Sequence, residues 1–182
     1  MTEPMWVFAY GSLIWNPGFP VAEQGVARLE GWHRSFCMRS IHHRGSLAAP
    51  GLVLALDEAP GAVCDGLALR VEPGHETETL AGLRERELIS SAYLERRVAV
   101  ALADGRMTPA LAYVVDPRHD QYCRLDLETQ ARIIARAVGG RGTNRDYLIA
   151  TAEHLHALGI GDADLDWLAA RVASLAPATT QM

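Results

Sequence analysis

The sequence contains no lysine, and all 17 of its basic residues are arginine. A Schiff-base lysine, a lysine general base and a phosphate-loop lysine are therefore excluded. Cysteine is scarce, since only Cys37, Cys64 and Cys123 are present, and no CxxC pair occurs. A zinc knuckle and a thioredoxin-type redox motif are excluded on that ground. We expect reduced thiols in a cytoplasmic protein, with Cys37 and Cys64 packed as small core residues.

Long apolar runs and excess positive charge are also missing. No run approaches the roughly 20 apolar residues that span a bilayer, and no apolar signal segment follows the acidic Glu3. The formal net charge is −5, which argues against a nucleic-acid or anionic-membrane partner. Hydrophobic residues make up 49% of the 182 positions, which is enough for a buried core. We therefore expect a soluble monomer.

The order of predicted elements indicates an α+β fold. We expect one domain over residues 1–176 and a frayed tail over residues 177–182. Strands dominate the first half, one helix interrupts them, and helices finish the chain without strict alternation. A small, mostly antiparallel sheet or barrel with peripheral helices follows from this order. The predicted strands are Trp6–Tyr10, Val26–Arg39 in two segments with a bulge near Gly31, a hairpin of Gly51–Leu56 and Gly66–Val71 around Pro60-Gly61, and a hairpin of Arg97–Leu102 and Pro109–Val115 around Asp104-Gly105.

Capping residues place the helices. A first helix is predicted over Thr77–Ala92. Three more follow, one capped by Asp126 and ending at Gly139-Gly140, one capped by Asn144 and ending at Gly159, and one capped by Asp162.

The first candidate for chemistry is the passage from strand to loop at residues 9–14. A glycine directly after an apolar strand allows a sharp turn and leaves backbone N–H groups open to a ligand. Successive N–H groups turned one way form a nest that binds a carboxylate or an oxyanion. The plain alternative is a tight turn. Ser12 as a nucleophile is disfavoured, because no GxSxG elbow surrounds it.

The second candidate is Glu87. At helical spacing, Leu80, Leu83 and Glu87 share one stripe, while Glu85 lies nearly opposite. A carboxylate that faces an apolar core must find a partner or raise its pKa, and a pKa raised toward neutrality suits a general acid/base. The alternatives are an ion pair with an arginine or a residue at the rim of the helix.

The remaining polar candidates carry weaker signals. Arg39, at the end of a strand, can bind a substrate carboxylate with its fork or can pair with an internal acid. The histidines form no HExxH motif and no Cys/His/Asp cluster with metal spacing, so we expect surface or loop positions and no metal site. The candidates considered among the seven histidines are His42, His43, His75, His154 and His156.

Seven stretches together resemble one family. They are Trp6–Phe19, Gly31–Ser40, Arg44-Gly45, Pro50–Leu56, Arg86–Ile89 with Tyr93-Leu94, Asp116–His119 with Gln121-Tyr122, and Gly142–Asn144 with Tyr147-Leu148. The set is similar to the ChaC-like, glutathione-specific γ-glutamylcyclotransferases. The matches run in family order from Trp6 to about Leu175.

The resemblance implies a γ-glutamylcyclotransferase-like mixed barrel with peripheral helices. It implies a lyase that converts glutathione to 5-oxoproline and cysteinylglycine without a cofactor, with Glu87 as the catalytic residue. The family's substrate-binding loop would correspond to Ala9, Tyr10, Gly11, Ser12, Leu13 and Ile14. Apart from the resemblance, we expect Arg39 and Tyr122 to bind the substrate and Tyr93 to donate a hydrogen bond near the site. Three alternatives remain open: another γ-glutamyl substrate, a non-catalytic γ-glutamyl-binding domain, and a metal-dependent hydrolase.

Overall fold

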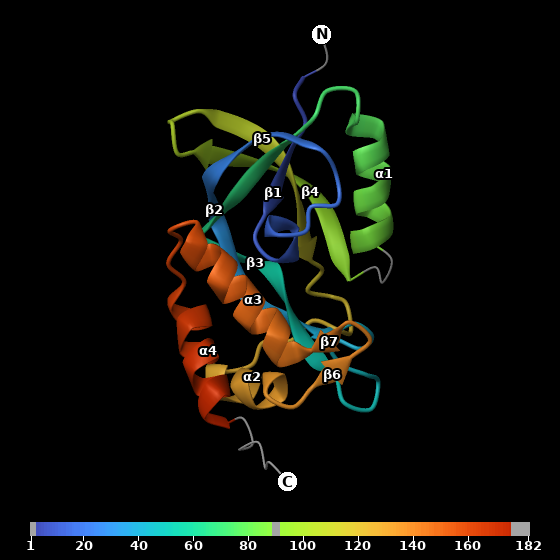
Figure 1. Cartoon of the computed structure of the whole chain (residues 1–182), viewed down its shortest axis with the longest axis vertical. Helices are drawn as coiled ribbons and strands as arrows, with labels where there is room; N and C mark the ends of the chain where they lie inside the picture. The colour runs from blue at the N-terminus through green and yellow to red at the C-terminus, as the bar shows by residue number, and fades with distance from the viewer. Residues whose placement is uncertain (1–2, 89–91, 176–182) are drawn as a thin grey trace. The chain divides into compact units, whose positions relative to one another are not determined.

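The computed structural model describes residues 3–88 and 92–175 (Figure 1). The chain divides into two compact units, which are Met1–Ser35 with Leu54–Tyr122 and Phe36–Val53 with Cys123–Met182. The single domain expected over residues 1–176 stays a prediction, and the expected tail lies outside the described residues.

The first unit contains a closed barrel with strand order β1-β3-β2-β4-β5. Strand β1 runs antiparallel to β3 and parallel to β5, while β4 runs antiparallel to both β2 and β5. The expected mixed, mostly antiparallel barrel in an α+β protein is confirmed. The strands are β1 (Trp6–Ala9), β2 (Val21–Ser40), β3 (Gly51–Val71), β4 (Tyr93–Leu102) and β5 (Met107–Val115).

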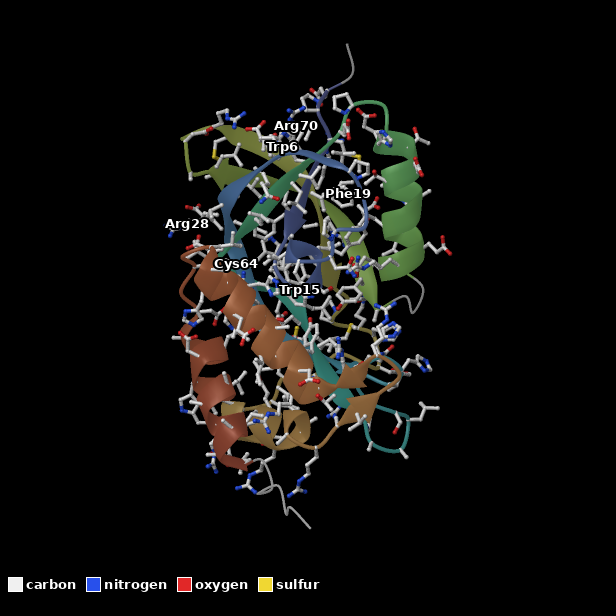
Figure 2. The ribbon with its side chains drawn as sticks, in the orientation of Figure 1. Trp6, Trp15, Phe19, Arg28, Cys64 and Arg70 are labelled. Atoms are coloured by element: carbon white, nitrogen blue, oxygen red, sulfur yellow. The ribbon has the colours of Figure 1, made fainter. Side chains whose placement is uncertain are left out.

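Strand β1 is a buried strand of the barrel and leads directly into the candidate loop. Val7, Phe8 and Ala9 are wholly buried, so the strand is covered on both faces. Its register with β3 places Trp6 opposite Arg70 (Figure 2). This burial holds the end of β1, and hence the start of the loop, in a fixed position.

The hairpin between β4 and β5 is confirmed, and both strands are longer than expected. Gly105 has a φ of 94°, which a glycine adopts without strain. The Asp104 carboxylate accepts the Arg106 N–H at 3.0 Å, which closes the turn.

Two expectations about the long strands were wrong. The segments Gly51–Leu56 and Gly66–Val71 belong to the single strand β3, and β2 is one strand rather than two. Gly31 and Gly61 have φ values of 88° and 85°. One residue with positive φ can be absorbed as a local irregularity within a strand, so Pro60-Gly61 does not reverse the chain.

Helix α1 (Glu76–Glu87) is shorter than the predicted Thr77–Ala92. The Leu88 N–H donates to the Arg84 carbonyl at 2.9 Å and closes the last turn. Ala92 lies outside the helix, directly before β4, and residues 89–91 lie outside the described residues. Glu87 is therefore the last residue of α1.

The second unit packs helices around its own core. Its elements are α2 (Leu127–Ile134), β6 (Val138–Gly139), β7 (Gly142–Thr143), α3 (Asn144–Ala157) and α4 (Ala163–Leu175). The Arg171 guanidinium on α4 donates to the Glu128 carboxylate on α2 at 2.7 and 2.8 Å. Most buried side chains of these helices are apolar, and Gln130, Asn144 and Thr151 are the buried polar ones. The apolar ones include Ile134, Leu148, Leu155, Leu165, Leu168 and Val172.

Two of the three predicted caps in this unit are confirmed. The Asp126 carboxylate accepts the Thr129 N–H at 2.7 Å, and the Asp162 carboxylate accepts the Leu165 N–H at 3.1 Å. The third prediction was wrong, because Thr143 caps α3 and Asn144 is its first residue.

Helix α2 also ends earlier than predicted, at Ile134, since Val138–Gly139 forms strand β6 and pairs with β7. Within residues 3–88 and 92–175, no helix is both long enough and apolar enough to cross a membrane.

Candidate functional site

The predicted loop follows directly after β1 and contains the 3-10 turn η1 (Ser12–Ile14). The Ile14 N–H donates to the Gly11 carbonyl at 2.9 Å. Among the described residues, the N–H groups of Gly11, Ser12 and Leu13 have no acceptor. Gly11 and Leu13 are buried. Because an N–H without an acceptor is costly in a buried residue, the donors of Gly11 and Leu13, with that of half-buried Ser12 between them, suit a bound electronegative group.

Buried side chains anchor the start of this loop. The Tyr10 hydroxyl donates to the Tyr113 carbonyl on β5 at 2.5 Å. The Arg34 guanidinium, which is 4% exposed, donates to the Tyr10 carbonyl at 2.8 Å and also to the Asp65 carbonyl on β3. Charge-assisted bonds to these two backbone carbonyls tie Tyr10, directly before Gly11, to the interior of β3.

Helix α1 presents Glu87 as the sequence pattern predicted. Leu83 is buried, Leu80 is half-buried and Glu85 is exposed. The Glu87 side chain is 16% exposed, so it lies on the covered side of the helix at its last residue. The predicted helix phase is confirmed, and the alternative of an ion pair with arginine holds as well, because Arg86 lies against the carboxylate.

Arg86 connects α1 to the loop. Its Nη1 donates to the Asn16 carbonyl at 2.6 Å and its Nη2 donates to the Ser12 hydroxyl at 3.1 Å. Its Nε lies 3.4 Å from the Glu87 Oε1 atom. One guanidinium group therefore reaches both parts of the predicted site, the loop after β1 and the carboxylate at the end of α1.

A second carboxylate lies near the same region of the barrel. The Tyr113 hydroxyl donates to the Glu95 carboxylate at 3.0 Å, and the Arg84 guanidinium donates to both Glu95 oxygens at 3.0 and 3.1 Å. Burial raises the pKa of the Tyr113 phenol, and the carboxylates of Glu95 and Glu87 raise that pKa further. The hydrogen bond from Arg84 lowers the pKa of Glu95. Tyr113 thus stays protonated at neutral pH and serves as a hydrogen-bond donor.

The first unit also contains a cavity of about 690 Å³ between α1, β4, β5 and the residues before β1. Trp6, Leu80, Arg84 and Glu95 are among its lining residues. Neither the loop at residues 9–14 nor Glu87 contributes to this lining.

The predicted tyrosines both bond to neighbouring strands of the first unit. The Tyr122 hydroxyl donates to the Asp57 carboxylate at 2.9 Å, and the Tyr93 hydroxyl donates to the Leu54 carbonyl at 2.9 Å. Arg39 belongs to the second unit, where it is half-buried on β2 and its charge acts on the Cys123 thiol. The roles of Arg39 and Tyr122 in substrate binding stay predictions.

The segment at His42 to Arg44 is bonded within the second unit. The Gly140 N–H donates to the His42 carbonyl at 2.7 Å, and the Arg141 N–H donates to the His43 carbonyl at 2.9 Å. Burial lowers the pKa of His43, and the positive charges of Arg141 and Arg44 lower it further. These bonds fasten the segment to the β6–β7 hairpin.

Metal-ligating side chains are scattered in the part of the chain that the structure describes. No group of three His, Cys, Asp or Glu side chains there is arranged to hold a metal ion. Cys37 and Cys64 are buried in the two cores, as predicted, and burial raises the pKa of the Cys123 thiol.

Sequence reasoning missed Arg34 and did not assign Arg86 its contacts. Arg34 lies in a long strand close to apolar positions, and an arginine in such a strand indicates a buried, fully bonded guanidinium. Arg86 precedes the candidate base, but its partners Ser12 and Asn16 lie 74 and 70 residues away.

Comparison with known proteins supports the same fold. The family model for the ChaC-like protein matches residues 5–175. The glutathione-specific gamma-glutamylcyclotransferase of Escherichia coli (strain K12) is 38% identical over 176 residues, which cover 94% of this chain and 74% of that protein. Glutathione-specific gamma-glutamylcyclotransferase 1 of Rattus norvegicus is 32% identical over 180 residues, which cover 96% of this chain and 81% of that protein.

A solved structure shows the fold directly. The crystal structure of a yeast gamma-glutamyl cyclotransferase specific to glutathione matches with a TM-score of 0.87 at 22% identity. The match covers 99% of this chain and 100% of the yeast chain. With a family model that spans nearly the whole sequence, this chain belongs to the ChaC-like protein family.

Proposed function

We propose that this protein is a glutathione-specific γ-glutamylcyclotransferase, a lyase that releases 5-oxoproline and cysteinylglycine. The observation that carries the proposal is the joining of Glu87, through Arg86, to a loop with three N–H donors that have no acceptor among the described residues. The names of the bacterial and mammalian relatives support glutathione as the substrate.

The reaction is an intramolecular exchange of one amide for another. The substrate's α-amine attacks its own γ-carbonyl and forms the ring C–N bond, and the C–N bond to the cysteinyl nitrogen breaks. Two protons leave the attacking nitrogen and two arrive on the departing nitrogen, so no water and no redox partner is consumed. An enzyme nucleophile is unnecessary, which agrees with the absence of lysine.

Glu87 is the proposed general base and general acid. The attacking nitrogen is an ammonium group at neutral pH, so it must lose a proton before it can attack. A carboxylate that is 16% exposed at the end of α1 can take this proton and then return it to the leaving nitrogen. The same group serves both steps because the C–N bond that forms and the C–N bond that breaks share the γ-carbon atom.

The loop after β1 is the proposed binding and oxyanion-stabilising element. Negative charge develops on the γ-carbonyl oxygen as the ring closes, and fixed N–H donors stabilise such charge without reorganisation. Gly11, Ser12 and Leu13 supply these donors, and Tyr10 and Arg34 hold the loop in place. Holding the flexible γ-glutamyl chain in a folded, reactive shape lowers the activation free energy further, by on the order of several kcal/mol.

The proposal also covers the remaining substrate contacts, the oligomeric state and the location of the protein. Arg39 and Tyr122 are proposed to complete substrate binding. We propose a cytoplasmic monomer without nucleic-acid or membrane partners, which the net charge of −5 supports.

The direct test is to incubate the purified protein with millimolar glutathione and a metal chelator. We expect 5-oxoproline and cysteinylglycine in equal amounts. Intact glutathione with a folded protein would overturn the substrate, and γ-glutamyl-alanine would then separate another γ-glutamyl substrate from a binding role.

Glu87→Gln tests the assignment of the base. The amide keeps the size of the side chain and cannot accept the proton, so we expect normal folding and a loss of at least about two orders of magnitude in kcat. Glu85→Gln is the matched control, because Glu85 is exposed on the same helix, and its activity should equal that of the wild type. Near-normal turnover by Glu87→Gln would contradict the assignment.

A further inference from the structure

Arg86 differs from three other paired arginines of the first unit. Arg28, Arg84 and Arg106 each donate Nε and an Nη group to carboxylates, and their side chains are more than half exposed. The Arg86 side chain is 23% exposed and donates both Nη groups to the loop, to the Asn16 carbonyl and the Ser12 hydroxyl. A surface ion pair alone does not explain this arrangement.

The contact of Arg86 with Glu87 is a longer ion pair than the one between Arg84 and Glu95. The Nε atom lies 3.4 Å from Oε1, beyond the 2.7–2.9 Å typical of a charge-assisted hydrogen bond. Arg84, by comparison, forms a two-pronged bridge with Glu95 at 3.0 and 3.1 Å. Arg86 thus places positive charge beside Glu87 while its shorter bonds go to the loop.

The planar shape of the guanidinium group fixes the separation between the groups that it bonds. Its three nitrogen atoms lie in one rigid plane, so their partners are held at fixed separations. Here the partners are the Ser12 hydroxyl, the Asn16 carbonyl and the Glu87 carboxylate. The group therefore sets the distance between the loop donors and the carboxylate at the end of α1.

We propose that Arg86 is a positioning residue, which holds the Glu87 carboxylate and the η1 loop at a working separation and keeps positive charge beside the carboxylate. The inference rests on the proposed function, since it assigns Arg86 a role in that same site. Both functions of the group, geometry and charge, can be separated by substitution.

Arg86→Lys keeps the charge but replaces the three-nitrogen plane with a single head group. Arg86→Gln removes the charge and most of the donors. Since misplacement by about 1 Å can cost about 100-fold, we expect kcat/KM to fall about 10- to 100-fold in both variants. The acid limb of the pH profile should stay near its wild-type position in Arg86→Lys and move to higher pH in Arg86→Gln, because a neighbouring cation favours the ionised carboxylate.

A double-mutant cycle with Ser12→Ala tests the link to the loop. If Arg86 acts through the Ser12 hydroxyl, adding Ser12→Ala to Arg86→Gln should cost less than Ser12→Ala costs alone. Strict additivity of the two losses would contradict the link. The control is Arg106→Gln, which removes a guanidinium bonded to Asp104 and Glu23 elsewhere in the same unit and should leave kcat/KM unchanged.

The outcomes distinguish the inference from the proposed function. A wild-type protein that leaves glutathione intact refutes the proposed function. An active wild type, an inactive Glu87→Gln variant and fully active Arg86 variants refute the role of Arg86 alone. If Arg86→Gln fails to fold, Arg86→Lys decides, because its full activity with a stable fold would overturn the geometric role.

Discussion

The contact between Asn144 and Leu52 in the second unit yields a quantitative prediction. Asn144 is the first residue of α3 and is fully buried, with 0% exposure. Its Oδ1 accepts the Leu52 N–H at 2.7 Å, and its Nδ2 donates to the Leu52 carbonyl at 2.8 Å. Both bonds satisfy backbone groups of β3 that an alanine at position 144 would leave without partners.

The magnitude follows from those two backbone groups. A buried donor or acceptor left unsatisfied costs about 1–3 kcal/mol, so two of them cost about 2–6 kcal/mol. We therefore expect Asn144→Ala to lower the free energy of unfolding by about 2–6 kcal/mol, a large part of the roughly 5–15 kcal/mol typical of a domain. The corresponding fall in Tm is about 4–24 °C for a chain of this size.

Urea unfolding followed by far-UV circular dichroism measures this loss of stability. An unchanged m-value, the slope of the unfolding free energy against urea concentration, shows that the variant and the wild type undergo the same transition. Thr143→Ala is the matched control at the adjacent residue. It removes the cap bond at 3.1 Å from the Asp146 N–H and should cost about 1 kcal/mol. If Asn144→Ala costs no more than Thr143→Ala, the reasoning about the buried bridge to Leu52 is refuted.

Two further predictions concern charge and close packing. Hydrogen bonds from Arg171 lower the pKa of Glu128 to about 2 from 4.5, so its stabilisation is present above about pH 4.5 and is lost as the pH falls toward 2. The Tm difference between wild type and Glu128→Gln should shrink between about pH 5 and pH 2. A difference that is as large at about pH 2 as at about pH 6 would contradict this linkage. A Cβ atom at Gly66 would overlap the Ala9 carbonyl, so Gly66→Ala should lower the free energy of unfolding by about 1–3 kcal/mol and reduce kcat/KM. Urea titration measures the first effect and the glutathione assay the second. Gly25→Ala is the control, because a Cβ atom at Gly25 would meet open space. Wild-type stability and activity in Gly66→Ala would refute the close approach.

Local patterns predicted the features whose decisive contacts lie within a few residues. The caps at Asp126 and Asp162 depend on N–H groups three residues further along. The turn at Asp104-Gly105 depends on the flexibility of one glycine and one side-chain bond. The phase of α1, which puts Glu87 on the covered side, depends on helical spacing from Leu83 alone.

Other assignments failed because nearby residues do not decide them. Asn144 has the composition of a cap, yet its amide bonds to Leu52, and Thr143 caps the helix instead. Pro60-Gly61 has the composition of a turn, yet β3 continues through it because pairing along the barrel holds both of its ends. A turn-forming pair is compatible with a hairpin and with an irregular strand, and only the partner strands distinguish them.

By itself, the sequence determined the α+β class, the family resemblance and the residue types available for catalysis, including the absence of lysine. Only the tertiary structure decided that Arg34 bonds to the Tyr10 carbonyl and that Arg86 reaches Ser12 across 74 residues. The physical reason is that helical period and capping act over one turn of chain. The partner of a long side chain depends on barrel closure and strand register, which arise from the combined burial and hydrogen bonding of many distant residues.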